Sequence, residues 1–348
     1  MSDALWPDAI GRLLRREELP RDLTEQVMSA ILSGDATDAQ IAGFAVAMRT
    51  KGETPTELAT LVRTMLRFAE RVDLPSAGGP IIDTCGTGGD RAGTVNVSTM
   101  AALVAASAGA RVAKHGGRAA SSRCGSADVL EALGVVIDLG PEGVARCVDE
   151  AGIGFCFAPR YHAGLRFAAP ARRELGTPTT FNFVAPLANP AGVKRQIVGV
   201  SDPTMAERLI AMLADLGAER ALVFYGHDGL DELTVTTTST IHELRDGSID
   251  VYELDPTTLG IPRAQHRALA GGDAAGNAEV VHQVVAGASG PIRDIVALNS
   301  AAALLVADLV PDLAAGVKLA GEILDDGRAA ATLDALVRVS VAAREAGN

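Results

Sequence analysis

From Pro80 onward, short apolar runs alternate with segments of helical periodicity, and this alternation restricts the possible folds more than any other feature of the sequence. Strands that are buried on both faces of a sheet read as short apolar runs, and helices between successive strands allow parallel pairing. We therefore expect an α/β fold with a mostly parallel central sheet. The runs expected to form strands are Ile81-Ile82, Arg111–Ala113, Val135–Ile137, Phe155–Phe157, Gln196–Val198 and Ala221–Tyr225.

The segments between and after these runs fit the same fold. The two-residue turn Asp246-Gly247 predicts a hairpin that joins Ser239–Arg245 to Ser248–Glu253. Helical patterns, which have an apolar period near 3.6 residues, cover Val97–Ala108, Asp128–Leu133, Ala301–Val306 and Leu313–Leu324.

Residues 1–75 read as helices without intervening strands. Thr37 is followed three residues later by Gln40, and Thr54 by Glu57, which is the spacing of a capping box at a helix start. The stretch PSAGGP at 75–80 then interrupts regular structure. We therefore expect a small all-helical domain over 1–75 and a larger α/β domain over 80–348.

Charge and cysteine content limit the partners and the compartment. Acidic side chains number 43 against 31 basic ones, and the resulting net charge of −12 opposes attraction to nucleic acid or to an anionic bilayer. The four cysteines show no paired spacing, and the N-terminus has no uninterrupted apolar stretch that could serve as a signal peptide or membrane span. We expect a cytoplasmic protein that binds neither nucleic acid nor membranes.

The strongest signal of a ligand site is Asp83–Asp90 (DTCGTGGD), at the exit of the first expected strand. Its backbone amides can wrap a phosphate, although a tight structural turn would use the same residue types. Asn96–Thr99 (NVST) follows, directly before a helical pattern. A helix cap requires only one of these side chains, so the others are available to a phosphate or a metal ion. Together the two motifs predict a phosphorylated substrate.

Two further segments can complete such a site. Lys114 and Arg118 flank a pair of glycines at the end of an expected strand and form either a second anion clamp or a solvated basic loop. Asp231-Glu232 follows another expected strand. Adjacent carboxylates commonly lie on a solvated surface, but beside two phosphate loops this pair can hold Mg²⁺, which bridges carboxylates to substrate phosphates.

Several motifs occur in one order along nearly the whole chain: CGTGGD (85–90), NVST (96–99), KHGGRAASS (114–122), GSADVLEALGV (125–135), FAPRYH (157–162), ARRELG (171–176) and GLDELT (229–234). This ordered set resembles the anthranilate phosphoribosyltransferase family of tryptophan biosynthesis, which shares its fold with the pyrimidine nucleoside phosphorylases. The resemblance implies a helical domain completed by a segment near 165–190, an α/β domain, a cleft between them and a homodimer.

The implied reaction transfers the phosphoribosyl group of 5-phosphoribosyl 1-diphosphate (PRPP) to the amine of anthranilate and releases diphosphate. The resemblance assigns Lys114, His115, Asp231 and Glu232 to catalysis, and Ser98, Asp231 and Glu232 to Mg²⁺. It assigns Gly86, His115, Gly117, His162 and Arg172 to anthranilate. The residues implied to hold PRPP are Gly86, Gly89, Asp90, Thr94, Asn96, Val97, Ser98, Thr99, Lys114, Ser122 and Ser126.

The sequence departs from the family pattern on the acceptor side only. Gly117 stands where the family usually has Asn, Ala163 follows His162 in place of Pro, and Ala185–Pro190 reads APLANP instead of GPLTNP. These departures leave open transfer from PRPP to a different aromatic amine or aminobenzoate. The Asp-Glu pair and NVST disfavour a nucleoside phosphorylase, and the net charge disfavours a nucleic-acid-binding relative.

Overall fold

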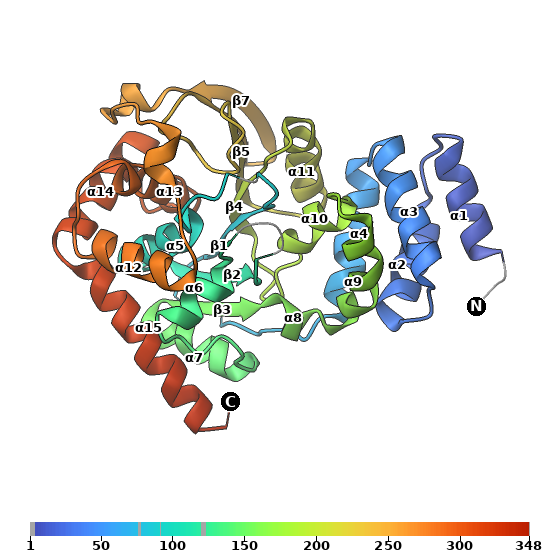
Figure 1. Cartoon of the computed structure of the whole chain (residues 1–348), viewed down its shortest axis with the longest axis horizontal. Helices are drawn as coiled ribbons and strands as arrows, with labels where there is room; N and C mark the ends of the chain where they lie inside the picture. Colours follow the sequence, from blue (N-terminus) through green and yellow to red (C-terminus); the bar gives the residue numbers. More distant parts are fainter. Residues whose placement is uncertain (1–3, 76–77, 91, 120–122, 348) are drawn as a thin grey trace.

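The computed structural model describes residues 4–75, 78–90, 92–119 and 123–347. The N-terminal helices lie at one end of the molecule, the sheet lies in the middle, and the C-terminal helices cover the opposite side (Figure 1). The α/β class expected from the sequence is confirmed by the order of these elements.

The central sheet has seven strands in the order β3-β2-β1-β4-β5-β6-β7. The strands from β3 to β5 pair in parallel, and β6 and β7 continue the sheet in antiparallel pairing. Most of the runs expected to be strands are therefore confirmed. The bounds are β1 Ile81–Gly86, β2 Arg111–Gly116, β3 Ile153–Phe157, β4 Arg195–Gly199, β5 Arg220–Gly226, β6 Ser239–Arg245 and β7 Ser248–Leu254.

The hairpin between β6 and β7 is also confirmed. Its turn residues Asp246 and Gly247 have φ values of 51° and 79°. A two-residue turn with positive φ at both positions matches the right-handed twist of the flanking strands.

The prediction of a strand at Val135–Ile137 is wrong. The segment is buried but pairs with no strand. The amide of Val135 donates to Leu130 O at the end of a helix, and the amide of Val136 donates to Ser340 Oγ. Because these partners satisfy the backbone, the apolar run is buried between helices without joining the sheet.

The N-terminal helices begin where the sequence places them. In α3 (Asp38–Lys51) and α4 (Pro55–Phe68), Thr37 and Thr54 form complete capping boxes with Gln40 and Glu57. Two further helices, α1 (Leu5–Leu14) and α2 (Arg21–Ser33), precede them.

The remaining helices follow the sheet strands along the chain. They are α5 Val97–Ser107, α6 Ser126–Ala132, α7 Pro141–Ala151, α8 Ala158–Tyr161, α9 Ala169–Leu175, α10 Thr180–Val184, α11 Pro203–Asp215, α12 Ala274–Val285, α13 Pro291–Val306, α14 Leu313–Asp325 and α15 Arg328–Glu345. Short 3₁₀ segments are η1 Ala163–Ala168, η2 Ala185–Leu187, η3 Pro256–Leu259 and η4 His266–Leu269.

The two faces of the sheet contribute to two hydrophobic clusters. In β5, Leu222 and Phe224 belong to the cluster formed with α5 and α13, whereas Ala221 and Val223 belong to the cluster formed with α11 and the N-terminal helices. The second cluster also contains Phe181 of α10, from the segment expected to complete the helical domain. The helices at 1–75 are thus continuous with one sheet face, and the domain boundary at 75–80 stays a prediction.

Strand order reverses between β1 and β4, which is the point where open α/β sheets bind ligands at the carboxyl ends of their strands. Here the main chain of Asp231 lies against the end of β4. A Cβ atom on Gly199 would lie 1.6 Å from the carbonyl oxygen of Asp231. Only glycine at 199 permits this approach.

None of the helices among the described residues is long and apolar enough to cross a membrane.

We expect Gly199→Ala to lower the free energy of unfolding by about 1–3 kcal/mol or more, because the added methyl group collides with the backbone of Asp231. Gly321→Ala is the matched control, because a Cβ there has its nearest contact 3.7 Å away, at Arg293. A helix interior gains about 0.5–1 kcal/mol from that change. Urea unfolding measures both, and equal stability of the two variants would contradict the prediction.

Candidate active site

A cavity of about 670 Å³ opens at the carboxyl ends of the parallel strands. It brings together all the predicted site residues that the structure describes; Ser122 lies outside the described residues. The predicted residues that line the cavity are Gly86, Gly89, Asp90, Thr94, Asn96, Val97, Ser98, Thr99, Lys114, His115, Gly117, Ser126, His162, Arg172, Asp231 and Glu232.

The glycine-rich loop after β1 is folded around Asp231. The amide of Gly88 donates to Asp231 Oδ2 at 2.7 Å, and a Cβ atom on Gly86 would lie 2.5 Å from the same oxygen. Gly88 and Gly89 have φ values of 67° and 88°, which favour glycine. The loop and the Asp-Glu pair therefore form one unit, although 143 residues separate Gly88 from Asp231.

The Asn96–Thr99 motif is not a simple helix cap. Asn96 makes no capping hydrogen bond; its side chain donates to Cys124 O at 3.2 Å and accepts from Asn277 Nδ2 at 2.9 Å. At the start of α5 the amide of Ser98 donates to Glu232 Oε1 at 3.2 Å. Thr99 Oγ1 is buried with no partner among the described residues. An unpaired buried hydroxyl beside a cavity indicates a ligand contact.

Lys114 and Arg118 do not together form the anion clamp that was one of the two alternatives from the sequence. Arg118 is exposed and forms ion pairs with Asp128 at 3.0 Å and Glu131 at 2.8 Å. Lys114 is buried in β2; its Nζ donates to Thr84 O and lies 3.4 Å from Ser98 Oγ. Burial lowers the pKa of Lys114. Lys114 alone contributes a buried amine to the cavity.

Three carboxylates lie on the same side of the cavity as the glycine loop: Asp90, Asp231 and Glu232. Burial and Asp90 raise the pKa of Asp231, and burial and Asp231 raise the pKa of Glu232. The ionised forms repel one another and lack solvent, so this side of the cavity favours a bound cation.

The donor set fits Mg²⁺. Among the described residues, no three His, Cys, Asp or Glu side chains are grouped closely enough to hold a metal ion by themselves. Mg²⁺ is commonly held by one or two carboxylates together with water and substrate phosphates. Asp231, Glu232 and the hydroxyl of Ser98 supply oxygen donors of this kind.

Two neutral imidazoles lie on the other side of the cavity. His115 and His162 meet edge to face, with ring centroids 5.1 Å apart. His115 Nδ1 lies 3.2 Å from the carbonyl oxygen of Pro186, so this nitrogen carries the proton. His115 Nε2 is then a buried acceptor without a partner in the described residues. Burial, with His162 adding to it, lowers the pKa of His115 to about 3.

Arg172 is a half-buried cation that lines the cavity, as does the exposed Arg166. Burial lowers the pKa of Arg172, and no carboxylate of the described residues pairs with it. Its guanidinium lies 5.8 Å from the ring centroid of Phe181. A half-buried guanidinium without a described counterion favours an anionic ligand. A Cβ atom at Gly117, which also lines the cavity, would contact only Ala158, at 3.9 Å.

One wall of the cavity is formed by α10 and η2, and Phe181, Asn182, Ala185 and Pro186 line it. Sequence reasoning placed Ala185 and Pro186 on the acceptor side but missed Phe181 and Asn182, whose motif carries no chemical signal. It also included Asp83 only as part of the predicted phosphate loop, whereas the structure shows it holding neighbouring segments. This buried carboxylate accepts from His115 N at 3.1 Å and from Asn189 Nδ2 at 2.8 Å. A carboxylate inside an apolar strand is the signal that could have identified it.

Comparison with known proteins gives consistent matches over both parts of the chain. Residues 7–69 match the helical bundle domain of the glycosyl transferase family, and residues 78–330 match its α/β domain. The anthranilate phosphoribosyltransferase of Salinispora arenicola is 51% identical over 99% of both chains. That of Acidothermus cellulolyticus is 54% identical over 97% of this chain and 96% of its own.

Comparison with solved structures gives matches to the same family. Anthranilate phosphoribosyltransferase from Thermus thermophilus superposes with a TM-score of 0.90 and 40% identity, over 96% of this chain and 99% of the other. The enzyme from Saccharomyces cerevisiae, solved in complex with PRPP and Mg, gives a TM-score of 0.89 at 26% identity, over 98% and 99% of the two chains.

We expect His115 to lower the stability of the folded protein by about 2 kcal/mol as the pH is lowered from about 7 to about 5. The pKa of His115 is about 3 in the folded state, against 6.5 ordinarily, so the unfolded chain takes up a proton over this window and the folded chain does not. Its contribution is therefore fully present above about pH 6.5 and is lost toward pH 3.

Urea unfolding at both pH values checks this, because the change in stability between them should be about 2 kcal/mol more favourable for His115→Asn than for the wild type. His266→Asn, at an exposed histidine, is the control. The prediction is wrong if His115→Asn retains the wild-type pH dependence.

Proposed function

The chain belongs to the anthranilate phosphoribosyltransferase family, and from this premise we propose that its cavity binds PRPP and anthranilate and joins them as N-(5-phosphoribosyl)anthranilate, with release of diphosphate. One observation carries the proposal: a single cavity has a glycine loop with clustered carboxylates on one side, and on the other side neutral imidazoles with a half-buried arginine that pairs with no described carboxylate. The first side suits a metal-bound diphosphate, and the second suits an aromatic amine that carries a carboxylate.

The donor half consists of the glycine loop, the start of α5 and the start of α6. Loop amides and the N-terminus of a helix favour phosphate oxygens. The buried amine of Lys114 and the unpaired hydroxyl of Thr99 support this assignment. The residues proposed to hold PRPP are Gly86, Gly89, Asp90, Thr94, Asn96, Val97, Ser98, Thr99, Lys114, Ser122 and Ser126.

We propose Ser98, Asp231 and Glu232 as the residues that hold Mg²⁺. The raised pKa values of both carboxylates support the proposal, because a cation would offset their repulsion. When bound, the metal ion neutralises charge on the diphosphate leaving group.

We assign Arg172 to the carboxylate of anthranilate, since a guanidinium can pair with a carboxylate through two hydrogen bonds. Gly86, His115, Gly117 and His162 complete the acceptor half. His115 Nε2 can accept a hydrogen bond from the amine, because Nδ1 is committed to Pro186 O. The names of the relatives favour anthranilate over a different aromatic amine.

The residues of the chain contribute to the reaction mainly by positioning the two substrates. Cleavage of the bond from ribose C1 to diphosphate gives an oxocarbenium-like centre, while negative charge develops on the leaving group. Lys114 and the loop amides face that charge. The acceptor is a neutral aromatic amine, so His115 needs only to orient it and to take a proton as the new bond forms. Holding two reactants in line contributes on the order of 7–11 kcal/mol.

The molecule also has a surface that supports a homodimer. An apolar groove lies between α1 and α3, and Leu14 and Val46 at its border are 73% and 45% exposed. We propose that a second copy covers this surface. The buried thiols of Cys85, Cys124, Cys147 and Cys156 support a reducing compartment, and we propose the cytoplasm.

A steady-state assay tests the proposed function. We expect the purified protein to release diphosphate and consume anthranilate only when PRPP, Mg²⁺ and anthranilate are all present. Removal of Mg²⁺ with a chelator should abolish turnover. No turnover of anthranilate, or turnover of another aminobenzoate instead, would reject the proposed acceptor.

The double variant Asp231→Asn with Glu232→Gln tests the metal site in the same assay. It should abolish turnover while the protein stays folded, because burial already opposes the ionised forms of both carboxylates. Thermal unfolding without metal checks the fold. Wild-type turnover of the double variant would remove the metal assignment.

We expect Arg172→Ala to raise the KM for anthranilate about tenfold or more, since an ionic hydrogen bond is worth about 1.5–3 kcal/mol. The KM for PRPP should change little. Arg173→Ala, at the adjacent and exposed arginine, is the matched control. An increase confined to the KM for PRPP would assign Arg172 to the donor half instead.

A further inference from the structure

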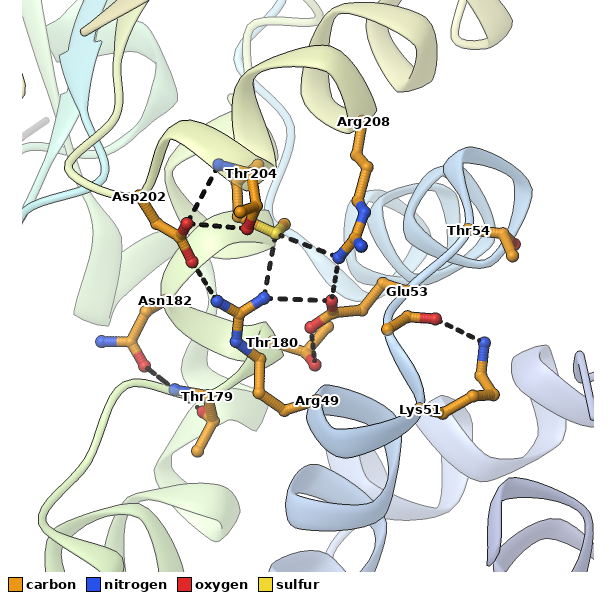
Figure 2. A network of polar contacts seen from close by, with 12 residues as sticks. Arg49, Lys51, Glu53, Thr54, Thr179, Thr180, Asn182, Asp202, Thr204 and Arg208 are labelled. Carbon is orange, nitrogen blue, oxygen red and sulfur yellow. Dashed lines mark hydrogen bonds and ion pairs between the residues drawn. The ribbon is translucent and has the colours of Figure 1, made fainter. Parts of the chain in front are cut away.

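A buried carboxylate outside the cavity joins three parts of the chain. Glu53 lies in the loop between α3 and α4, and its side chain is fully buried. Its carboxylate accepts hydrogen bonds from Thr180 Oγ1 at 2.7 Å, from Arg49 Nη1 at 3.2 Å and from Arg208 Nη1 at 3.3 Å (Figure 2). These donors come from α10, α3 and α11.

The charges around Glu53 compensate one another. Arg49 also pairs with Asp202, so two guanidinium groups face two carboxylates. The guanidinium of Arg49 further lies 4.8 Å from the ring centroid of Phe183, in α10. A buried carboxylate that pairs with two guanidinium groups has little freedom to move, because moving away from either one would leave buried charge uncompensated. The network therefore fixes the start of α10 relative to α3 and α11.

This contact matters because α10 cannot hold its own position. The helix has five residues, far fewer than an isolated helix needs for stability. Its second and third residues, Phe181 and Asn182, line the cavity, and the carbonyl of Pro186, just beyond it, accepts from His115 Nδ1. Thr180 is the first residue of α10 and immediately precedes these two cavity-lining residues. The hydroxyl of Thr180 thus connects the Glu53 network to the acceptor half.

The donor half has independent support. The glycine loop is held by Asp231 through Gly88 N, and Ser201 Oγ donates to Gly88 O at 3.0 Å. Glu53 reaches this loop only indirectly, through Arg49 and Asp202. A change at the Thr180–Glu53 contact should therefore affect the acceptor half more than the donor half.

We propose that Glu53, through its hydrogen bond with Thr180, is a positioning residue that sets the acceptor wall formed by α10 and η2. Neither residue lines the cavity, so both act through Phe181, Asn182 and the Pro186 carbonyl. The inference rests on the proposed function for its kinetic consequence, but the placement of α10 can be measured without substrate.

Thr180→Val tests the contact most directly, because it removes the hydroxyl and keeps both the shape of the side chain and the charge balance. Glu53→Ala would leave two guanidinium groups without their partner and could unfold the protein. We expect Thr180→Val to raise the KM for anthranilate about tenfold, since small misplacements in a site can cost up to about 100-fold. The KM for PRPP should stay within about twofold of the wild type.

Two controls separate positioning from general destabilisation. Thr180→Ser restores the hydroxyl and should restore the KM for anthranilate. Thr64→Val removes another buried threonine hydroxyl, which donates only within α4 to Thr60 O at 2.8 Å, and should leave both KM values unchanged. Lower thermal stability of Thr180→Val with wild-type KM values, or an equal increase in both KM values, overturns the proposal.

Hydrogen–deuterium exchange of the segment 179–187, without substrates, gives a readout independent of activity. Thr180→Val should exchange faster there than the wild type, Thr180→Ser and Thr64→Val do. Unchanged exchange overturns the proposal even where the protein is active. If the wild type does not convert anthranilate, the proposed function fails, and exchange alone decides the positional role of Glu53.

Discussion

The site depends on one close approach of two backbone segments. The main chain at Asp231 occupies the space that a side chain at Gly199 would fill, at the point where the strand order reverses. From this position Asp231 reaches the end of β1 and binds the amide of Gly88. The Asp231-Glu232 pair and the glycine loop are therefore positioned by the same contact.

The charged side chains divide the cavity into two halves that favour ligands of different charge. On the donor side, clustered carboxylates outnumber the single buried amine of Lys114, so a polyanionic substrate can bind well only together with a cation. On the proposed acceptor side, Arg172 pairs with no carboxylate in the described part of the chain, and burial lowers the pKa of His115 and His162 and keeps both neutral. An aromatic amine with a carboxylate supplies the missing anion without adding a second cation.

Local sequence signals predicted most of the fold and of the donor half. The capping boxes, the β6–β7 turn and the glycine loop each depend on residues within a few positions of one another, so their spacing defines their structure. The run Val135–Ile137 was misread because apolar composition reports burial, whereas a strand also requires a free edge to pair with. Arg118 could not be placed from its own motif, since its partners Asp128 and Glu131 lie on the following helix.

The acceptor wall shows why the remaining part of the site resists prediction. Strand ends are fixed by the ladders of the sheet, whereas the rest of the proposed acceptor half lies on or beside α8, η1, α9, α10 and η2, none longer than seven residues. Segments this short take their position from whatever they pack against. Here η1, α9, α10 and η2 share a hydrophobic cluster with the N-terminal helices. Those helices are therefore part of the acceptor site in physical terms, although α1 to α4 contribute no residue to the lining of the cavity.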